Sequence, residues 1–222
     1  MPYEAIIFDV SDTLISYSPS WAEIFGGKLR ALGFETSAET ILAVSNAVYR
    51  ANVEHSGMDE AALSCVSCPE EKRAEYLRQM ALTPMPEQEM SVILGVFEAL
   101  NALKSDYRLA IVSNHFRWLP DYLKECGLFD YFEAVIVSQI VGVEKPDVRI
   151  MGCALRALNL PPERCLYVGD QPLDVLCAKG AGLDCAWIAR ADTKMPDSIP
   201  YKEDYRINSV ADLPAILKEA AQ

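Results

Sequence analysis

The apolar positions of this chain follow two different patterns. Residues 4–9 form a short apolar run rich in Ile and Phe, which is typical of a buried strand. From about residue 19 to residue 92 the apolar positions recur with helical spacing, and we expect helices over residues 19–32, 38–54, 69–82 and 86–94. Pro69, Pro84 and Pro86 mark helix starts or stops, because proline is tolerated in a first turn but not inside a helix.

From about residue 96 onward, predicted strands alternate with predicted helices. The predicted strands cover residues 108–113, 134–138, 165–169 and 185–189, and the predicted helices cover residues 118–126, 147–158 and 173–181. This alternation is typical of βαβ units with right-handed crossovers, which build a doubly wound, Rossmann-like parallel sheet. The sequence therefore predicts an α/β core of residues 1–15 and 93–222, interrupted by an inserted all-helical domain of residues 16–92.

Composition and charge narrow the class of protein. Hydrophobic residues make up 51% of the 222 residues and charged residues 23%, which is ordinary for a soluble globular chain. The net charge is −12 and no Lys/Arg cluster stands out, so we expect neither nucleic acid nor a membrane as a partner. No apolar run approaches the roughly 20 residues that a membrane span requires.

The seven cysteines are scattered through apolar stretches. Their odd number, together with the lack of a signal-peptide pattern, favours reduced thiols and a cytoplasmic location. Cys65 and Cys68 have the spacing of a redox or zinc pair, but no second pair follows, and neither His55 nor His115 completes a recognisable finger. A metal or redox role for this pair is the lesser alternative.

Polar residues gather where the predicted strands end, which is where ligands bind in doubly wound sheets. Each position alone is ordinary turn chemistry, but their order along the chain is informative. The residues are Asp9 after the first strand, Ser113 and Asn114 after the second, Lys145 in the loop of residues 142–147, and Asp170 after Gly169, with Asp174 four residues further on.

These motifs resemble those of the haloacid dehalogenase (HAD) superfamily. The resemblance covers residues 4–14 and about 96–189, and it implies that Asp9 is a nucleophile. It also implies that the helical insert is a C1-type cap that closes over the site and supplies contacts to the leaving group. The stretch of residues 142–147 is similar to nucleotidase-like and dehalogenase-like members, and it is shared by many specificities.

A carboxylate can attack phosphorus only if the phosphoryl charge is neutralised, and a hard cation bound by oxygens suits this task. Asp9 and Asp170 come from adjacent predicted strand ends, so they can share one Mg²⁺. The resemblance implies that the backbone carbonyl of Ser11 is the third protein ligand. A backbone ligand does not depend on the side chain at that position.

The remaining polar residues suit binding and positioning. The Ser113 hydroxyl can donate to a phosphoryl oxygen, and Asn114 is a further candidate for substrate binding. Lys145 can supply an ammonium that also steadies Asp9. Asp174 is expected not to bind the metal itself but to orient Lys145 or a metal-bound water.

Ser11 departs from the pattern of the resembled family. In most of its phosphatases the residue two places after the nucleophile is a second Asp, which serves as general acid and base. The loss of such a group costs about 10²–10⁴ in rate, mainly for substrates with poor leaving groups. His115 and Asp12 are possible substitutes, although a loop role for His115 and a turn or capping role for Asp12 are the simpler interpretations.

Three functions remain open from the sequence. The first is a Mg²⁺-dependent phosphohydrolase that acts on a small phosphorylated metabolite with a weakened or relocated acid/base. The second is a 2-haloacid dehalogenase acting on a halogenated molecule, where displacement of halide needs no acid. The third is a catalytically silent binding protein that keeps the fold. The lack of an acid at position 11 is compatible with the second and favours the third. Dehalogenases of the resembled family carry an aromatic residue at this position, and its absence, together with the retained Asp170, counts against the second.

Substrate contacts from the helical insert are harder to identify. Aromatic and polar residues near the hinge and on later helices are candidates, but aromatic residues at helical spacing usually belong to a core. The candidates are Tyr17, Trp21, Phe25, Tyr49, Arg50, Glu54 and His55.

Overall fold

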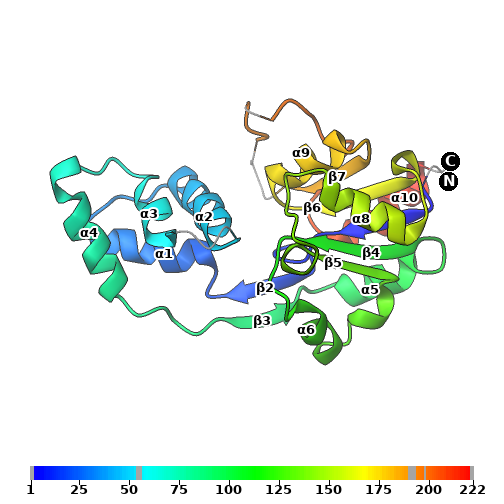
Figure 1. Cartoon of the computed structure of the whole chain (residues 1–222), viewed down its shortest axis with the longest axis horizontal. Coiled ribbons are helices and arrows are strands. Elements are labelled where there is room, and N and C mark those ends of the chain that lie inside the picture. Colours follow the sequence, from blue (N-terminus) through cyan, green and yellow to red (C-terminus); the bar gives the residue numbers. More distant parts are fainter. Residues whose placement is uncertain (1–2, 54–56, 190–193, 198, 221–222) are drawn as a thin grey trace. The chain divides into compact units, whose positions relative to one another are not determined.

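The computed structural model describes residues 3–53, 57–189, 194–197 and 199–220. The chain divides into two compact units (Figure 1). The first, here called the sheet unit, comprises Met1–Ser16 and Ser91–Gln222, and the second, the helical unit, comprises Tyr17–Met90. The sequence placed these divisions one or two residues away, at 15/16 and 92/93.

The sheet unit is built on six strands in the order β5-β4-β1-β6-β7-β8. Their bounds are β1 Ala5–Phe8, β4 Arg108–Ser113, β5 Ala134–Val137, β6 Cys165–Gly169, β7 Asp184–Ile188 and β8 Tyr205–Ile207. Every neighbouring pair is parallel, and β1 lies between β4 and β6, so that Phe8 pairs with Ile111 on one side and with Val168 on the other. The predicted doubly wound parallel sheet is confirmed, with the change of winding direction at β1.

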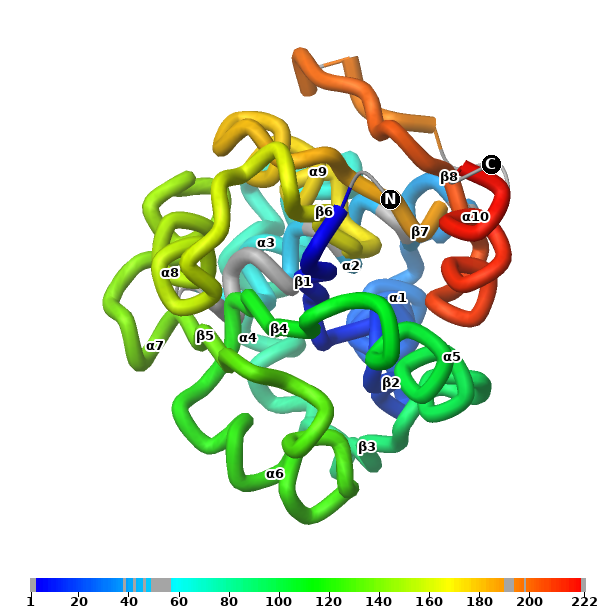
Figure 2. Tube along the Cα trace, turned by 90° about the vertical axis from the view of Figure 1, so that its right-hand side faces the viewer, coloured from blue at the N-terminus to red at the C-terminus, as the bar shows by residue number. Residues whose placement is uncertain are grey.

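Helices cover both faces of this sheet. Ile7, Val112 and Tyr167 belong to one fully buried face, which packs against α8 (Arg149–Leu158) and α9 (Pro172–Gly180). Alternate residues such as Ile6 and Phe8 are equally buried, so the opposite face is covered as well. Figure 2 shows α5 (Val96–Leu103) and α10 (Leu213–Ala220) on that opposite side. Burial on both faces explains why the strands read as continuous apolar runs.

Short elements complete the sheet unit. They are α6 Leu119–Glu125, α7 Ser138–Val141, and the 3₁₀ turns η1 Phe129–Tyr131, η2 Pro162–Arg164 and η3 Val210–Asp212. The helix α7 follows β5 directly and ends at Gly142, whose φ of 71° lies in the left-handed region that glycine adopts without strain. This turn leads the chain into the loop that carries Lys145.

The helical unit contains α1 Trp21–Ala31, α2 Ala38–Val53, α3 Met58–Leu63 and α4 Glu70–Leu82. Helix α1 begins with a capping box, in which the Ser20 hydroxyl accepts from the Glu23 backbone N–H and the Glu23 carboxylate accepts from the Ser20 backbone N–H. The four helices share a core of their own. Inside it the buried Lys28 ammonium donates to Asp59 at 2.8 Å and to the Met80 carbonyl at 3.0 Å, which joins α1, α3 and α4.

One predicted helix is wrong. Residues 86–94 contain the strand β3 (Glu89–Val92), which forms a two-stranded sheet with β2 (Ile15–Ser18). Exposed and half-buried residues alternate along β3, as expected for a strand, and four residues are too few for a helical period to be distinguished from this alternation. The short elements α3, α10 and β8 were not expected from the sequence, for the same reason of length.

No helix in the described part of the chain is long and apolar enough to cross a membrane.

Candidate active site

The carboxyl ends of β1, β4 and β6 bring the predicted site residues to one edge of the sheet. Asp9 follows β1, and its backbone N–H donates to the Val168 carbonyl at 2.8 Å, so β1 and β6 stay paired up to this residue. Asp170 follows β6 directly, and Ser113 ends β4. Because β4 and β6 flank β1, all three residues lie where the winding of the sheet reverses.

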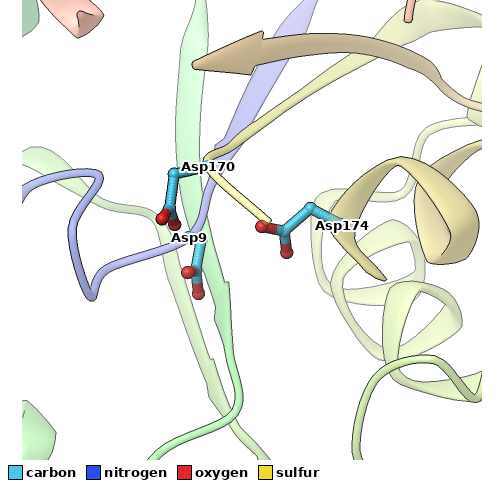
Figure 3. Close-up of side chains that lie close together, drawn as sticks. All are labelled: Asp9, Asp170 and Asp174. Atoms are coloured by element: carbon cyan, nitrogen blue, oxygen red, sulfur yellow. The ribbon is translucent and has the colours of Figure 1, made fainter. Parts of the chain in front are cut away.

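Three carboxylates meet at this edge. One oxygen each of Asp9, Asp170 and Asp174 lies within 4.8 Å of the others, and no second group of three or more such ligands occurs among the described residues. Figure 3 shows Asp9 and Asp170 side by side at the ends of neighbouring strands, with Asp174 reaching toward them from α9. Asp9 and Asp174 are almost completely buried, whereas Asp170 is half-buried.

Asp174 is held in place by the first turn of α9 and by a glycine. Its Oδ2 accepts from the Gln171 backbone N–H at 2.9 Å as part of a capping box. Gly169 packs against the same side chain: a methyl group there would lie 2.8 Å from Asp174 Cβ and closer still to its carboxyl group. Position 169 therefore has to be glycine for the carboxylate to take this place.

Lys145 is the buried cation of the site. Its Nζ lies 2.6 Å from Asp174 Oδ1 and 3.0 Å from Asp9 Oδ1. The contact with Asp174 is a hydrogen bond, whereas the contact with Asp9 is an ion pair without hydrogen-bond geometry, which leaves the buried Asp9 Oδ1 without a hydrogen-bond donor among the described residues. Burial alone would lower the pKa of Lys145, but the charges of Asp174 and Asp9 outweigh it and raise that pKa well above its ordinary value.

Tyr167 is a site residue that the sequence did not indicate. It is fully buried on β6, and its hydroxyl accepts from Lys145 Nζ at 2.9 Å. Its single proton has two acceptors within reach, the Val112 carbonyl at 2.9 Å and Asp174 Oδ1 at 3.2 Å. In the sequence this tyrosine reads as one more apolar strand residue. Tyr167 and Gly169 lie two residues apart on β6 and therefore on the same face of the sheet, which is the face that packs against Asp174.

Asn114 holds the loop of Lys145. Its Oδ1 accepts from the Lys145 backbone N–H at 2.7 Å, and its Nδ2 donates to the Lys145 carbonyl at 2.9 Å. This reciprocal pair joins the end of β4 to a residue 31 positions further along the chain. Asn114 thus positions the ammonium of Lys145, and its predicted contact with substrate stays a prediction.

Ser113 carries an unused hydroxyl. The residue is fully buried, and its Oγ has no hydrogen-bond partner among the described residues. A buried polar atom without a partner costs free energy, so such atoms in a native fold call for an explanation. The Ser113 hydroxyl lies at the edge of the site beside Asn114, where it could donate a hydrogen bond to a bound ligand.

Ser11 and its neighbours form the turn after Asp9. Ser11 is buried and makes an isolated parallel bridge with Ile15, while the Thr13 hydroxyl donates to Asp170 Oδ1 at 3.5 Å. Asp12 adopts φ 56°, a left-handed conformation that Asp tolerates better than most residues. The predicted use of the Ser11 carbonyl as a metal ligand stays a prediction.

Neither predicted substitute for the missing acid has favourable surroundings. Asp12 lines a cavity of about 400 Å³ between the turn, β3 and η3, and none of the predicted site residues lines that cavity. His115 Nδ1 accepts from the Phe116 backbone N–H at 2.9 Å. Burial of its ring lowers the pKa of His115 to about 4, so the imidazole is neutral near pH 7 and holds no proton on Nδ1.

The donor set fits a divalent cation. Three carboxyl groups face one ammonium in a largely buried place, and burial raises the pKa of Asp174 above its ordinary value. Asp174 is occupied by Lys145 and by the Gln171 N–H, whereas Asp9 Oδ1 has no hydrogen-bond donor among the described residues. Hard cations such as Mg²⁺ prefer carboxylate oxygens of this kind. Asp9 and Asp170 are therefore the side chains that suit direct coordination.

The candidate contacts of the helical unit remain untested. Phe25 is buried in the helical core, and the half-buried Trp21 packs against it at 6.2 Å between ring centroids. Tyr17 is half-buried. The side chains of Tyr49, Arg50, Glu54 and His55 lie outside the described residues.

The pair Cys65 and Cys68 shows contacts that need no metal. Both thiols are half-buried in the helical unit and lie against backbone carbonyls, Cys65 Sγ at 3.4 Å from Ala61 and Cys68 Sγ at 3.5 Å from Pro69. Both side chains also pack against the helical core.

Known proteins share these features. The family model for haloacid dehalogenase-like hydrolases matches residues 6–188. The pyrimidine 5'-nucleotidase YjjG of Escherichia coli is 29% identical over 199 residues, covering 86% of this chain and 75% of that protein.

Two solved structures share the fold. The putative HAD-hydrolase YfnB from Bacillus subtilis, bound to magnesium, has a TM-score of 0.65 at 21% identity and covers 98% of this chain and 99% of its own. The L-2-haloacid dehalogenase from Xanthobacter autotrophicus, with chloropropionic acid covalently bound, has a TM-score of 0.65 at 16% identity and covers 97% and 98%. Since the family model spans most of the chain and the parallel sheet carries its acidic residues at the expected strand ends, the protein belongs to the haloacid dehalogenase-like hydrolase family.

Proposed function

We propose that this protein is a Mg²⁺-dependent phosphohydrolase that acts on a small phosphorylated metabolite through an aspartyl-phosphate on Asp9. The observation that carries the proposal is a pair of buried atoms at one edge of the sheet. Asp9 Oδ1 is paired with the Lys145 ammonium at 3.0 Å, and Ser113 Oγ has no hydrogen-bond partner among the described residues. The Asp9 carboxylate is a nucleophile that could attack phosphorus, and the Ser113 hydroxyl could donate a hydrogen bond to a phosphoryl oxygen.

The chain's own residues divide the work. Asp9 Oδ1 lies 3.0 Å from the Lys145 ammonium, which holds the side chain in place by an ion pair. The Ser113 hydroxyl donates to a phosphoryl oxygen, and Lys145 adds positive charge where the negative charge of the transferring group collects. Asp174 and Tyr167 orient the ammonium from the side away from substrate. Asp9, Asp170 and the Ser11 carbonyl would hold Mg²⁺, which would further neutralise phosphoryl charge.

Proton transfer is the weak part of this site. Ser11 offers a hydroxyl where the family's phosphatases place a carboxyl, so neither the departing group nor the attacking water has the usual partner. Substitution of Ser11→Asp should restore that partner. We expect turnover of alkyl phosphates to rise by about 10²-fold in this variant, and unchanged turnover would mean that position 11 does not limit the reaction.

The proposal is tested by trapping the intermediate. The protein is mixed with Mg²⁺ and acetyl phosphate, quenched in acid and analysed by mass spectrometry, with Asp9→Asn as the matched control. We expect a phosphoryl adduct on Asp9, no adduct in the variant, and loss of turnover when EDTA removes the metal. Turnover that survives EDTA refutes the proposal.

The 2-haloacid dehalogenase is the second candidate, favoured by the absence of a carboxyl at position 11. The same protein incubated with a 2-chloro acid without metal distinguishes the two reactions. Release of halide in that experiment would show that Asp9 attacks carbon rather than phosphorus. Failure of both reactions, with Mg²⁺ still bound, would assign the fold to a silent binding protein.

A further inference from the structure

We propose that the substrate is an aryl phosphate, a phosphate monoester of a phenol, whose ring stacks on the aromatic loop that follows β4. The aromatic loop consists of His115, Phe116 and Trp118. This inference rests on the proposed phosphohydrolase activity and specifies the group that leaves. Two independent observations lead to it, one from proton chemistry and one from the aromatic loop.

The first observation concerns the leaving group. With Ser11 in place of a carboxyl group, the oxygen that departs from phosphorus must leave as an anion. Neither alternative removes this need: Asp12 lines the cavity beside β3, which none of the predicted site residues lines, and the His115 ring is buried with Nδ1 already accepting a backbone hydrogen bond. A phenolate leaves unaided far more readily than an alkoxide does. The site therefore selects esters of acidic hydroxyl groups.

The second observation is the aromatic loop itself. It begins at the strand end that carries Ser113 and Asn114. The Phe116 and Trp118 rings are nearly parallel, with 13° between their planes and 6.2 Å between centroids, and the His115 ring meets Trp118 edge-on at 4.7 Å. Trp118 also meets the Tyr122 ring edge-on at 6.3 Å, and it is still 41% exposed, which leaves surface of this large side chain for a further aromatic partner.

The backbone of the aromatic loop is held rigidly. The N–H of His115 donates to the Ser138 hydroxyl at 3.1 Å, and the N–H of Arg117 donates to Gln139 Oε1 at 3.2 Å. Both partners belong to α7, which packs beside β5. The N–H of Phe116 is satisfied by the His115 ring. A platform fixed in this way binds a ring without ordering a flexible loop first.

The reaction balances without an acid. An Asp9 carboxylate oxygen forms the new bond to phosphorus, the bond from phosphorus to the aryl oxygen breaks, and its electron pair leaves on the phenolate, which takes a proton from bulk water. A water molecule then forms a bond to phosphorus, the bond from Asp9 to phosphorus breaks, and its electron pair returns to the carboxylate. One proton of that water stays on the phosphate and the other goes to solvent.

The rates distinguish these two steps. The second step contains no leaving group, and it too lacks the usual base at position 11. We therefore expect the aspartyl-phosphate to accumulate, so that phenol is released in a burst followed by a slower steady state. Across a series from para-nitrophenyl to phenyl to alkyl phosphate, kcat/KM should fall by about 10²-fold or more. The kcat values of the aryl members should be nearly equal, because they share the second step.

The contribution of the ring is tested at Trp118. In Trp118→Ala, KM for phenyl phosphate should rise about 2- to 10-fold, the value of one aromatic pair, while KM for acetyl phosphate stays unchanged. Trp118→Phe should keep most of the wild-type KM. Tyr201→Ala is the matched control, because Tyr201 is an aromatic residue of similar exposure, 39%, in a different loop, and it should leave both values unchanged.

The outcomes separate this inference from the proposed function. Equal kcat/KM for glycerol phosphate and phenyl phosphate would overturn the preference for a phenol. An unchanged KM for phenyl phosphate in Trp118→Ala would overturn the assignment of the aromatic loop. In either case Mg²⁺-dependent hydrolysis of acetyl phosphate would leave the phosphohydrolase proposal standing, whereas absence of that hydrolysis would refute both.

Discussion

Replacing Ser113 with alanine should make the protein more stable and less active. Ser113 is fully buried, and its hydroxyl has no partner among the described residues. An unsatisfied buried polar group costs about 1–3 kcal/mol, and this cost disappears when the hydroxyl is removed. At roughly 2–4 °C per kcal/mol for a chain of this size, Tm should rise by about 2–12 °C. A serine that serves only the fold would give the opposite sign.

Ser138 supplies the matched control. It is also buried, but its hydroxyl accepts from the His115 backbone N–H at 3.1 Å and lies 3.3 Å from the His115 carbonyl. Ser138→Ala leaves those backbone groups without their partner, so the free energy of unfolding should fall by about 1–3 kcal/mol. The two substitutions are chemically identical, and only the hydrogen-bonding of the native hydroxyl distinguishes them.

The assay combines thermal unfolding with hydrolysis of acetyl phosphate in the presence of Mg²⁺. For Ser113→Ala we expect kcat/KM to fall by about 10²–10³, the usual loss when one donor to a transferring group is removed. A higher Tm together with lower activity would show that the Ser113 hydroxyl destabilises the fold but serves ligand binding. If Ser113→Ala is destabilised and retains full activity, the hydroxyl has a structural partner and no catalytic role, and this reasoning is wrong.

Three further predictions concern the metal, the glycine and the buried histidine. Mg²⁺ should raise Tm, because a ligand that binds only the folded protein adds about 2.7 kcal/mol to the free energy of unfolding at a concentration 100 times its Kd, and Asp170→Asn should abolish most of this rise. Gly169→Ala should lower kcat, because the added methyl group displaces Asp174 and with it Lys145. The check is that the variant stays folded and that its loss of activity is the same at every pH. Because burial lowers the pKa of His115 from 6.5 to about 4, protonation favours the unfolded chain, and stability should be lost as the pH falls through this window. The loss approaches about 3 kcal/mol at 1.36 kcal/mol per pKa unit, and urea titrations of His115→Gln at pH 7 and pH 4.5 should show a smaller change than the wild type.

The sheet could be predicted because its strands are buried on both faces. The strands β1, β4 and β6 are continuous apolar runs, and each is followed at once by a polar residue. The order of strands and crossovers then brings Asp9, Ser113 and Asp170 to one edge without any knowledge of side-chain positions. Local patterns were insufficient for β3, since four residues that pair with β2 look much like the end of a helix.

The inner layer of the site could not be predicted in the same way. The substrate contact of Asn114 stays a prediction, but nothing in the sequence indicates that its amide makes two hydrogen bonds to the backbone of Lys145. Tyr167 was not expected at all, because a tyrosine in an apolar strand gives no sign that its hydroxyl will meet an ammonium. Both contacts join residues more than 20 positions apart, and they depend on the register between neighbouring elements, which the sequence pattern does not specify.

The position of Ser11 becomes more informative when these contacts are considered together. A chain that no longer catalysed any reaction would have no reason to keep a buried Ser113 hydroxyl without a partner among the described residues, because such a group lowers stability unless a ligand uses it. Ser113, which we propose binds a phosphoryl oxygen, is thus maintained at a cost in stability. Of the residues that carry the proposed roles, only Ser11 departs from the pattern of the resembled family. This combination favours a change in the kind of leaving group over a loss of catalysis, which is the distinction that the aryl phosphate series measures.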